Sequence, residues 1–306
     1  MGWTAAVFND SSGSGDCAPA ARKVEEMFAA AGREARVTVA TGGGKGLREA
    51  AERAVADGCD TLVAGGGDGT INLAASVLVG RDIPLGVLPL GTLNHFAKDL
   101  GIPLELEDAV RVILDGVTCP VDVGEVNGRI FLNNSSLGVY PAIVRLRERY
   151  QASGLGKWVA ALWASLTVLR RNPFMAVRLI VHDEATVRRT PFVFVGNNEY
   201  RMVGLQAGTR ESLTRRNIAV YVLNADRRVG LLRLAWQVLF KGVDQVKELD
   251  LLTVTEATIE TRRPRLQVAL DGEVVVLASP LEYRSRPAAL NVYVPADASA
   301  CQPLIP

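Results

Sequence analysis

The stretch Gly65-Gly66-Gly67-Asp68-Gly69-Thr70 follows directly after the apolar run Asp60-Thr61-Leu62-Val63-Ala64. This order predicts a buried parallel strand that passes through a tight turn into a helix. We call residues 65–70 the glycine turn. Glycine accepts positive φ without steric cost, so the turn can direct several backbone N–H groups at one anion, to which the helix N-terminus adds partial positive charge. The pattern favours a phosphate-binding turn, and the alternative is a tight turn without a ligand.

Asp68 is unexpected in such a turn, because a carboxylate among phosphate-binding amides is electrostatically unfavourable. A cation, a proton or a polarised water between the carboxylate and the phosphate removes the conflict. A nucleotide that carries Mg²⁺ supplies such a cation.

The bulk properties exclude several classes of protein. The 306 residues are enough for two domains, and a formal net charge of +1 gives no reason to expect nucleic acid as a partner. The four cysteines are widely spaced and there are two histidines, so a zinc site or disulfide scaffold is not expected and a reducing compartment fits. No stretch approaches the roughly 20 apolar residues of a membrane span, and the N-terminus lacks the pattern of a secretory signal. We expect a soluble, cytoplasmic protein that can still contact a membrane.

The first part of the chain alternates β-rich with helical runs. The expected strands are residues 3–8, 34–40, 60–64 and 84–88, and the expected helices are residues 18–31, 46–57, 70–79 and 93–100. Alternation at this spacing predicts an α/β domain with a parallel sheet. The loops that follow the strands then lie at one edge of the sheet, where such sheets bind ligands.

The second part of the chain is dominated by β runs. They include residues 121–126, 129–133, 176–181, 192–195, 218–223, 251–259 and 266–269. We predict an antiparallel domain with two helical insertions, at residues 155–171 and 231–246. The expected boundaries are residues 1–118 for the first domain and 119–287 for the second, with residues 288–306 returning to the first.

Four further segments carry polar residues where a ligand could bind. The loop at residues 9–15 could line phosphates or be a surface turn. In residues 89–98, Thr92 or Asn94 could contact a ligand, cap the following helix, or do both. Asp122 lies in an apolar run and needs a buried partner, for which the alternative to a functional role is a backbone amide. Asp271-Gly272 is by itself typical of a hairpin turn.

In this order, the segments resemble the lipid kinases of the diacylglycerol kinase and sphingosine kinase superfamily, especially its bacterial soluble members, and more distantly the NAD kinases. The parts that carry the resemblance are the glycine turn with Asn72, residues 89–103, residues 121–124, and the chain from Asp271-Gly272-Glu273 through Tyr283 to Pro295. The resemblance implies a Rossmann-like α/β nucleotide-binding domain followed by a C-terminal antiparallel β-sandwich domain for a lipid substrate.

The resemblance also implies an ATP-dependent, Mg²⁺-requiring kinase that phosphorylates a lipid hydroxyl. Asp68 and Asp122 would organise Mg²⁺ and its waters. Asp271 and Glu273 match an acidic pair, one of which receives the proton of the lipid hydroxyl, and we favour Asp271. By position, the ATP contacts would be Asn9, Ser12, Gly13, Thr41, Gly65, Gly66, Gly67, Asp68, Gly69, Thr70, Gly91, Thr92, Asn94 and His95.

Three residues depart from the family pattern. His95 replaces an aspartate, and because imidazole attracts a cation less than a carboxylate does, we expect an altered metal or nucleotide preference rather than loss of activity. Arg216 stands where relatives commonly have the acid of a structural Mg²⁺ loop, so that site is expected to be absent or replaced by the guanidinium charge. Asp10 stands where the first loop usually has proline.

The substrate lipid would be met at a membrane surface. The predicted helices at residues 155–171 and 231–246 carry tryptophans beside cations, which suits peripheral contact with an anionic membrane, although both could instead pack on the second domain. Two other functions stay open. One is a non-catalytic nucleotide- or lipid-binding regulator, and the other is a kinase of a soluble hydroxylated metabolite.

Overall fold

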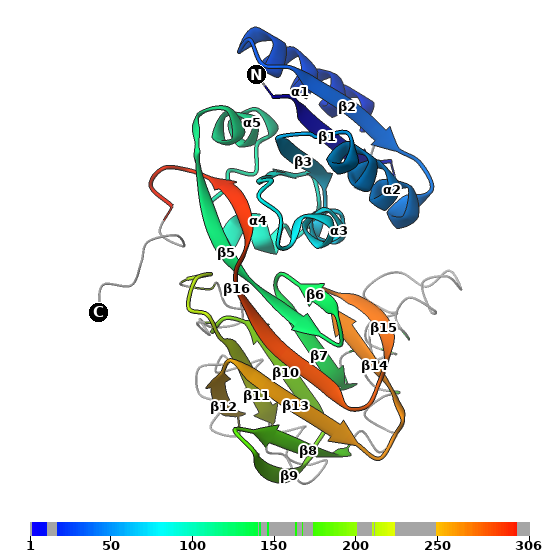
Figure 1. The fold of residues 1–306 in the computed structure, drawn as a ribbon. Helices are drawn as coiled ribbons and strands as arrows, with labels where there is room; N and C mark the ends of the chain where they lie inside the picture. The colour runs from blue at the N-terminus through cyan, green and yellow to red at the C-terminus, as the bar shows by residue number, and fades with distance from the viewer. Residues whose placement is uncertain are drawn as a thin grey trace. The chain divides into compact units, whose positions relative to one another are not determined.

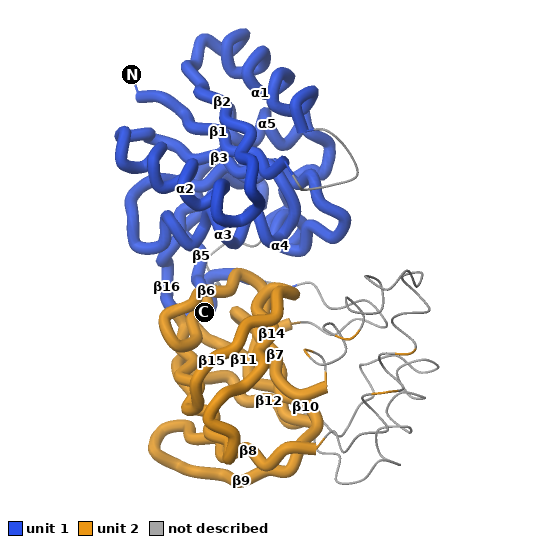
Figure 2. The backbone as a smooth tube through the Cα atoms, turned by 90° about the vertical axis from the view of Figure 1, so that its right-hand side faces the viewer, with its two compact units in different colours: residues 1–123, 210–216, 286–306 blue, residues 124–209, 217–285 orange. Residues whose placement is uncertain are grey.

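The computed structural model describes residues 2–10, 17–139, 174–200, 212–223 and 249–298, together with the single residues 141, 146, 163, 167 and 210. The chain divides into two compact units (Figure 2). Unit 1 comprises Met1–Val123, Arg210–Arg216 and Arg286–Pro306, and unit 2 comprises Gly124–Thr209 and Asn217–Ser285. The short segment of residues 210–216 thus belongs to unit 1, although the chain on either side of it belongs to unit 2.

Unit 1 is an α/β domain, as the alternating pattern predicts (Figure 1). Its parallel strands lie in the order β2-β1-β3-β4. They are β1 (Thr4–Asn9), β2 (Ala35–Ala40), β3 (Thr61–Gly66) and β4 (Leu85–Pro89), and the helices are α1 (Ala18–Ala30), α2 (Gly43–Ala56), α3 (Asp68–Leu78), α4 (His95–Asp99) and α5 (Leu106–Asp115). The central strands β1, β3 and β4 are buried along nearly their whole length, which is why they read as continuous apolar runs.

Helix α5 is not among the helices expected from the sequence. Its buried residues Ala109, Val110 and Ile113 form one face, and α5 packs against β4 and beside α1. Gly86 in β4 makes the close packing possible, because a Cβ there would lie 2.8 Å from Ile113 Cδ1. Helix α5 therefore covers part of β4, where the sequence pattern predicted no helix.

Two long strands contribute to both units. β5 (Val117–Val126) leaves unit 1 at Val123, and β16 (Leu281–Val294) enters it at Arg286. In unit 2, β16 pairs antiparallel with β13 (Glu256–Thr261). In unit 1, Val292 of the same strand pairs parallel with Leu85 of β4.

Unit 2 consists of antiparallel sheet on both sides of one core. One sheet has the order β12-β11-β10-β7-β14-β15, and its strands are β7 (Asn134–Gly138), β10 (Phe192–Asn197), β11 (Ile218–Leu223), β12 (Leu249–Val254), β14 (Arg265–Leu270) and β15 (Glu273–Ala278). Opposite it lie β6 (Arg129–Phe131), β8 (Met175–Val181), β9 (Glu184–Thr190) and β13, with parts of β5 and β16. Tyr283 crosses the core, where its hydroxyl lies 2.9 Å from Ser135 Oγ and burial raises the pKa of the phenol.

One predicted strand is wrong in this unit. Residues 251–259, expected as a single strand, form the ends of β12 and β13, which belong to different sheets. The chain turns at Thr255, whose carbonyl accepts a hydrogen bond from the Ser285 N–H. An uninterrupted β-rich run gave no sign of this change of sheet, because residues of both strands are apolar where they face the shared core.

The described cysteines are in two different states. Cys17 and Cys59 are buried thiols, and burial raises the pKa of the Cys59 thiol. Cys119, in contrast, is disulfide-bonded. Sequence spacing does not report which cysteines meet in space.

Most of the two predicted membrane-contacting helices lies outside the described residues. Of residues 155–171 the structure describes Trp163, which is exposed, and Thr167, and it describes none of residues 231–246. Within the described part of the chain, no helix is long and apolar enough to span a bilayer.

Candidate active site

The loops predicted to bind a ligand do follow parallel strands of one sheet. Asn9 ends β1, Thr41 follows β2, Gly67 follows β3 and Leu90 follows β4. Because the four strands are parallel, these positions lie at the same edge of the sheet of unit 1. Ser12 and Gly13, expected in the loop after β1, lie outside the described residues.

In the glycine turn, a single residue separates the strand from the helix. Gly65 and Gly66 are the last residues of β3, Asp68 is the first residue of α3, and Gly67 joins them with φ −85° and ψ −178°. The expectation that these glycines serve a positive φ is therefore wrong. They serve close approach, because a Cβ on Gly66 would lie 2.4 Å from Thr70 Oγ1.

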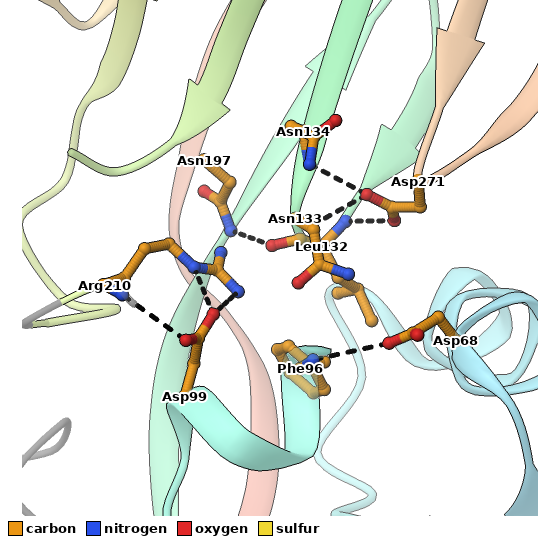
Figure 3. Close-up of polar contacts among 9 residues, drawn as sticks. All are labelled: Asp68, Phe96, Asp99, Leu132, Asn133, Asn134, Asn197, Arg210 and Asp271. Carbon is orange, nitrogen blue, oxygen red and sulfur yellow. Dashed lines mark hydrogen bonds and ion pairs between the residues drawn. The ribbon is translucent and has the colours of Figure 1, made fainter. Parts of the chain in front are cut away.

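A second close approach joins the glycine turn to the turn after β4. A Cβ on Gly91 would lie 2.5 Å from the Gly67 Cα, so the two turns meet backbone against backbone. Asp68, which is half-buried, accepts a hydrogen bond on Oδ1 from the Phe96 N–H at 3.4 Å (Figure 3). Asn9 is linked to the same turn through its Nδ2, 3.4 Å from Thr70 Oγ1.

Asn94 folds the turn after β4. Its backbone has φ 51°, its Oδ1 accepts the Gly91 N–H at 3.0 Å, and its Nδ2 donates to the carbonyls of Pro89 at 3.2 Å and Gly91 at 2.8 Å. It precedes α4 without a side-chain cap hydrogen bond, so the predicted capping role is wrong for Asn94. Thr92 and His95, at either side of it, are exposed.

Asp122 accepts hydrogen bonds from backbone amides, which was the alternative to a functional role in the sequence analysis. The residue is 1% exposed, and its Oδ2 accepts the Arg216 N–H at 2.5 Å while Oδ1 accepts the Ala288 N–H at 3.0 Å. The part of the chain that the structure describes contains no group of three or more histidine, cysteine or acidic residues placed to hold a metal. Mg²⁺ binding by Asp122 stays a prediction.

Arg216 reaches Asp122 through its main chain. Its φ is 61° and its side chain is exposed, so at this position the amide, and not the guanidinium charge, lies at the carboxylate. At Asp10, the N–H donates to the Ala40 carbonyl at 3.2 Å, a hydrogen bond that the proline of the family pattern could not make.

Asp271 is at the same time a hairpin residue and an oriented carboxylate in unit 2. It forms with Gly272 the two-residue turn between β14 and β15, with φ of 47° and 92°, as such turns require. Its carboxylate accepts three backbone N–H groups, from Leu132 at 2.8 Å, Asn133 at 2.8 Å and Asn134 at 2.9 Å (Figure 3). Glu273, the other member of the predicted acidic pair, is exposed.

The sequence did not predict that the backbone of residues 132–134 binds the Asp271 carboxylate. Asn197 supports it from β10, since its Nδ2 donates to the Leu132 carbonyl and its N–H to the Asn133 carbonyl, both at 2.9 Å. The available signal was the polar run Asn133-Asn134-Ser135-Ser136 within an apolar region. A polar run that is buried needs partners, and here it marks the backbone that binds the carboxylate.

Comparison with known proteins agrees with these features. A model of the diacylglycerol kinase catalytic domain matches residues 4–126. A diacylglycerol kinase of Mycobacterium tuberculosis is 30% identical over 305 residues, which cover 96% of each chain. The chain belongs to the diacylglycerol kinase family. Members of this family are kinases of the lipid kinase type, in agreement with the resemblance seen in the sequence.

Two further relatives bear on fold and length. A putative diacylglycerol kinase from Bacillus anthracis has the same fold, with a TM-score of 0.74 and 21% identity over 95% of this chain and 96% of that one. An uncharacterized protein of Synechocystis is 26% identical over 259 residues, which are 83% of this chain and 59% of that protein. The shared fold combines an α/β domain with antiparallel sheet, as expected for the family.

Proposed function

We propose that the protein transfers the γ-phosphate of ATP to a hydroxyl group of a lipid. The observation that carries this proposal is the backbone contact between Gly67 and Gly91 beside Asp68, at the edge of the sheet where parallel strands end. A turn without side chains lets phosphate oxygens approach the main chain closely. The name of the Mycobacterium tuberculosis relative adds diacylglycerol, or a lipid with a comparable hydroxyl, as the acceptor.

The residues around the glycine turn fit a nucleotide with Mg²⁺. Magnesium commonly keeps several waters and is held by one or two carboxylates together with substrate phosphates, and Asp68 is a half-buried carboxylate in the right turn. When bound, the ion supplies charge neutralisation at the transferred phosphate. Asp68 would hold its waters, and Asn9, Thr70 and Thr92 offer polar groups to the nucleotide.

Asp271 is our candidate for the group that receives the proton of the lipid hydroxyl. Its three backbone donors fix the direction of the carboxylate. Phosphoryl transfer depends mainly on positioning, so an oriented carboxylate suits it better than a mobile one. Glu273 is the alternative, since its exposed side chain carries the same chemical group.

The lipid acceptor places the reaction at a membrane surface. We infer that the protein works from the cytoplasm as a peripheral protein at the inner face of the membrane. Diacylglycerol-like and sphingoid-like lipids both present a hydroxyl near a headgroup, and apolar pockets discriminate chain length weakly.

The test is incubation of the protein with γ-labelled ATP, Mg²⁺ and a total lipid extract, in parallel with a mixture of water-soluble hydroxylated metabolites. We expect label in a lipid. Label in a soluble compound alone would replace the proposal by a metabolite kinase. Absence of label with every divalent metal, together with nucleotide or lipid binding in calorimetry, would replace it by a non-catalytic regulator.

A further inference from the structure

Arg210 and Asp99 form a buried ion pair inside unit 1. The side chain of Arg210 is 0% exposed and that of Asp99 is 6% exposed. Both Nη2 and Nε of the guanidinium donate to Asp99 Oδ2, at 2.7 and 2.8 Å, and the Arg210 N–H lies 3.4 Å from Oδ1 (Figure 3). One residue therefore contacts both oxygens of the carboxylate.

Because the ion pair is buried, its hydrogen-bond geometry indicates how strongly Asp99 is held in place. Removing two charges from water costs more than an average ion pair returns, so such a pair persists where its hydrogen bonds are well formed. Two guanidinium donors on Oδ2 and the backbone N–H near Oδ1 fix the direction of the carboxylate, and the compact ammonium group of lysine cannot reproduce the paired donors. Arg210 thus fixes the position and direction of the Asp99 carboxylate, in addition to neutralising its charge.

Asp99 is the last residue of α4, and the other end of the same helix lies at the glycine turn. The Phe96 N–H in the first turn of α4 donates to Asp68, and the side chains of Phe96 and Ala97 are buried. Helix α4 also follows directly after the turn that Asn94 closes and that meets Gly67. A shift of α4 would therefore move Asp68 and Gly91 relative to each other.

We propose that Arg210 is a positioning residue for nucleotide binding. Through Asp99 it fixes α4, and through α4 it holds the glycine turn and the turn after β4 in the arrangement that receives the phosphates. The inference rests on the proposed function insofar as that function assigns the nucleotide to these two turns.

The rest of segment 210–216 has its own anchors, which makes Arg210 testable. The Asp122 N–H donates to the Leu213 carbonyl at 2.8 Å, and the Arg216 N–H donates to Asp122. The side chain of Leu213 is fully buried. Replacement of Arg210 consequently leaves the segment attached to unit 1, and a folded variant is expected.

The experiment compares Arg210→Lys with the wild-type protein. The variant keeps the charge and loses the paired donors, and we expect its KM for ATP and its Kd for ADP to rise by about tenfold, with the KM for lipid within about twofold. Arg111→Lys is the matched control, since Arg111 forms an exposed ion pair with Asp108 in α5 of the same unit. It should leave all these constants unchanged.

A second control separates positioning from loss of stability. Val24→Ala removes methyl groups from a fully buried position of α1, so it lowers the melting temperature without touching α4. If Val24→Ala raises the KM for ATP as Arg210→Lys does, or if Arg210→Lys leaves both KM for ATP and Kd for ADP unchanged, the inference is overturned.

A wild-type protein that binds ADP but labels no lipid would refute the proposed function alone, and the Kd for ADP would still decide the role of Arg210. A wild-type protein that binds no nucleotide would overturn both.

Discussion

Among single residues, Asp68, Asp122 and Asp271 differ in what their oxygens contact. Asp122 is buried against two backbone amides, Asp271 is held by three, and Asp68 is half-buried with one amide at 3.4 Å. Hydrogen bonds from the main chain orient a carboxylate and occupy its lone pairs. Asp68 accordingly has the most capacity left for a hydrated cation, and Asp271 has the best-defined direction.

Asp271→Asn should reduce both activity and stability. The amide would turn its NH₂ group toward the Leu132 N–H, or turn it toward the two donors of Oδ1, so at least one donor faces a donor. Hydrogen bonds to charged groups are worth about 1.5–3 kcal/mol, and we expect a loss of that size in the free energy of unfolding, measured with urea. Lipid phosphorylation should fall by about 100-fold or more.

Glu273→Gln is the matched control for this variant. The side chain is exposed, so stability should not change. If Glu273→Gln abolishes phosphorylation while Asp271→Asn retains it, the proton acceptor is Glu273 and the role assigned to Asp271 is structural.

Arg216→Gly should be tolerated or slightly stabilising. The contact with Asp122 uses the backbone N–H, which glycine keeps, and glycine adopts the observed φ of 61° without strain. We expect the free energy of unfolding to rise by up to about 1 kcal/mol and the activity to stay at the wild-type level. A marked loss of stability would instead restore the hypothesis that the guanidinium replaces a structural metal.

His95→Asp should change the use of metal without changing the fold. His95 is exposed at the start of α4, so thermal unfolding should shift by no more than about 2 °C. A carboxylate attracts a cation more strongly than neutral imidazole, and the Mg²⁺ concentration for half-maximal activity should fall. An unchanged Mg²⁺ requirement would show that residue 95 does not act on the metal.

At the scale of elements, the contact between the turns after β3 and β4 is the feature most sensitive to a single methyl group. Gly91→Ala places a Cβ about 2.5 Å from the Gly67 Cα, closer than any relaxed contact allows. The turns must separate, and overpacking of this kind costs about 1–3 kcal/mol. We expect a lower melting temperature and a raised KM for ATP.

Gly44→Ala provides the control within the same unit. Gly44 lies in α2, where a Cβ would meet Leu73 Cδ1 at an ordinary distance of 3.4 Å. Alanine has the higher helix propensity, so stability should be retained or rise by about 1 kcal/mol. An equal loss of stability in Gly44→Ala and Gly91→Ala would indicate that the contact between the two turns is no more sensitive to an added methyl group than helix α2 is.

At the scale of the whole molecule, two compact units share a chain that crosses between them at β5, at β16 and on either side of segment 210–216. Within the described residues, Asp122 connects the last of these crossings to unit 1: it accepts the Arg216 N–H, and its own N–H donates to the Leu213 carbonyl. Removal of divalent metal should therefore leave the melting temperature unchanged within about 2 °C and stop phosphate transfer. A drop in melting temperature with chelator, reversed by Mg²⁺, would show that a structural metal site exists after all.

The sequence was a good guide wherever short-range patterns carry the information. Alternating strand and helix runs predicted the parallel sheet of unit 1, since burial on both faces demands continuous apolar strands. The same reasoning missed α5 and merged β12 with β13. Both depend on which distant surface an apolar residue meets, and a local pattern does not contain that information.

Residue types and their spacing were enough to identify the family, the sheet edge at which the loops gather, and Asp68 and Asp271 as candidate functional acids. The tertiary structure alone decided that the glycines serve close approach instead of positive φ, that Asp122 is bound by the amides of Arg216 and Ala288, and that Arg210 pairs with Asp99. The physical reason is that residue type and spacing fix what a segment can do locally. Which of its polar groups are satisfied, and by which partner, is fixed only when segments separated by about 100 residues or more pack together and exclude water.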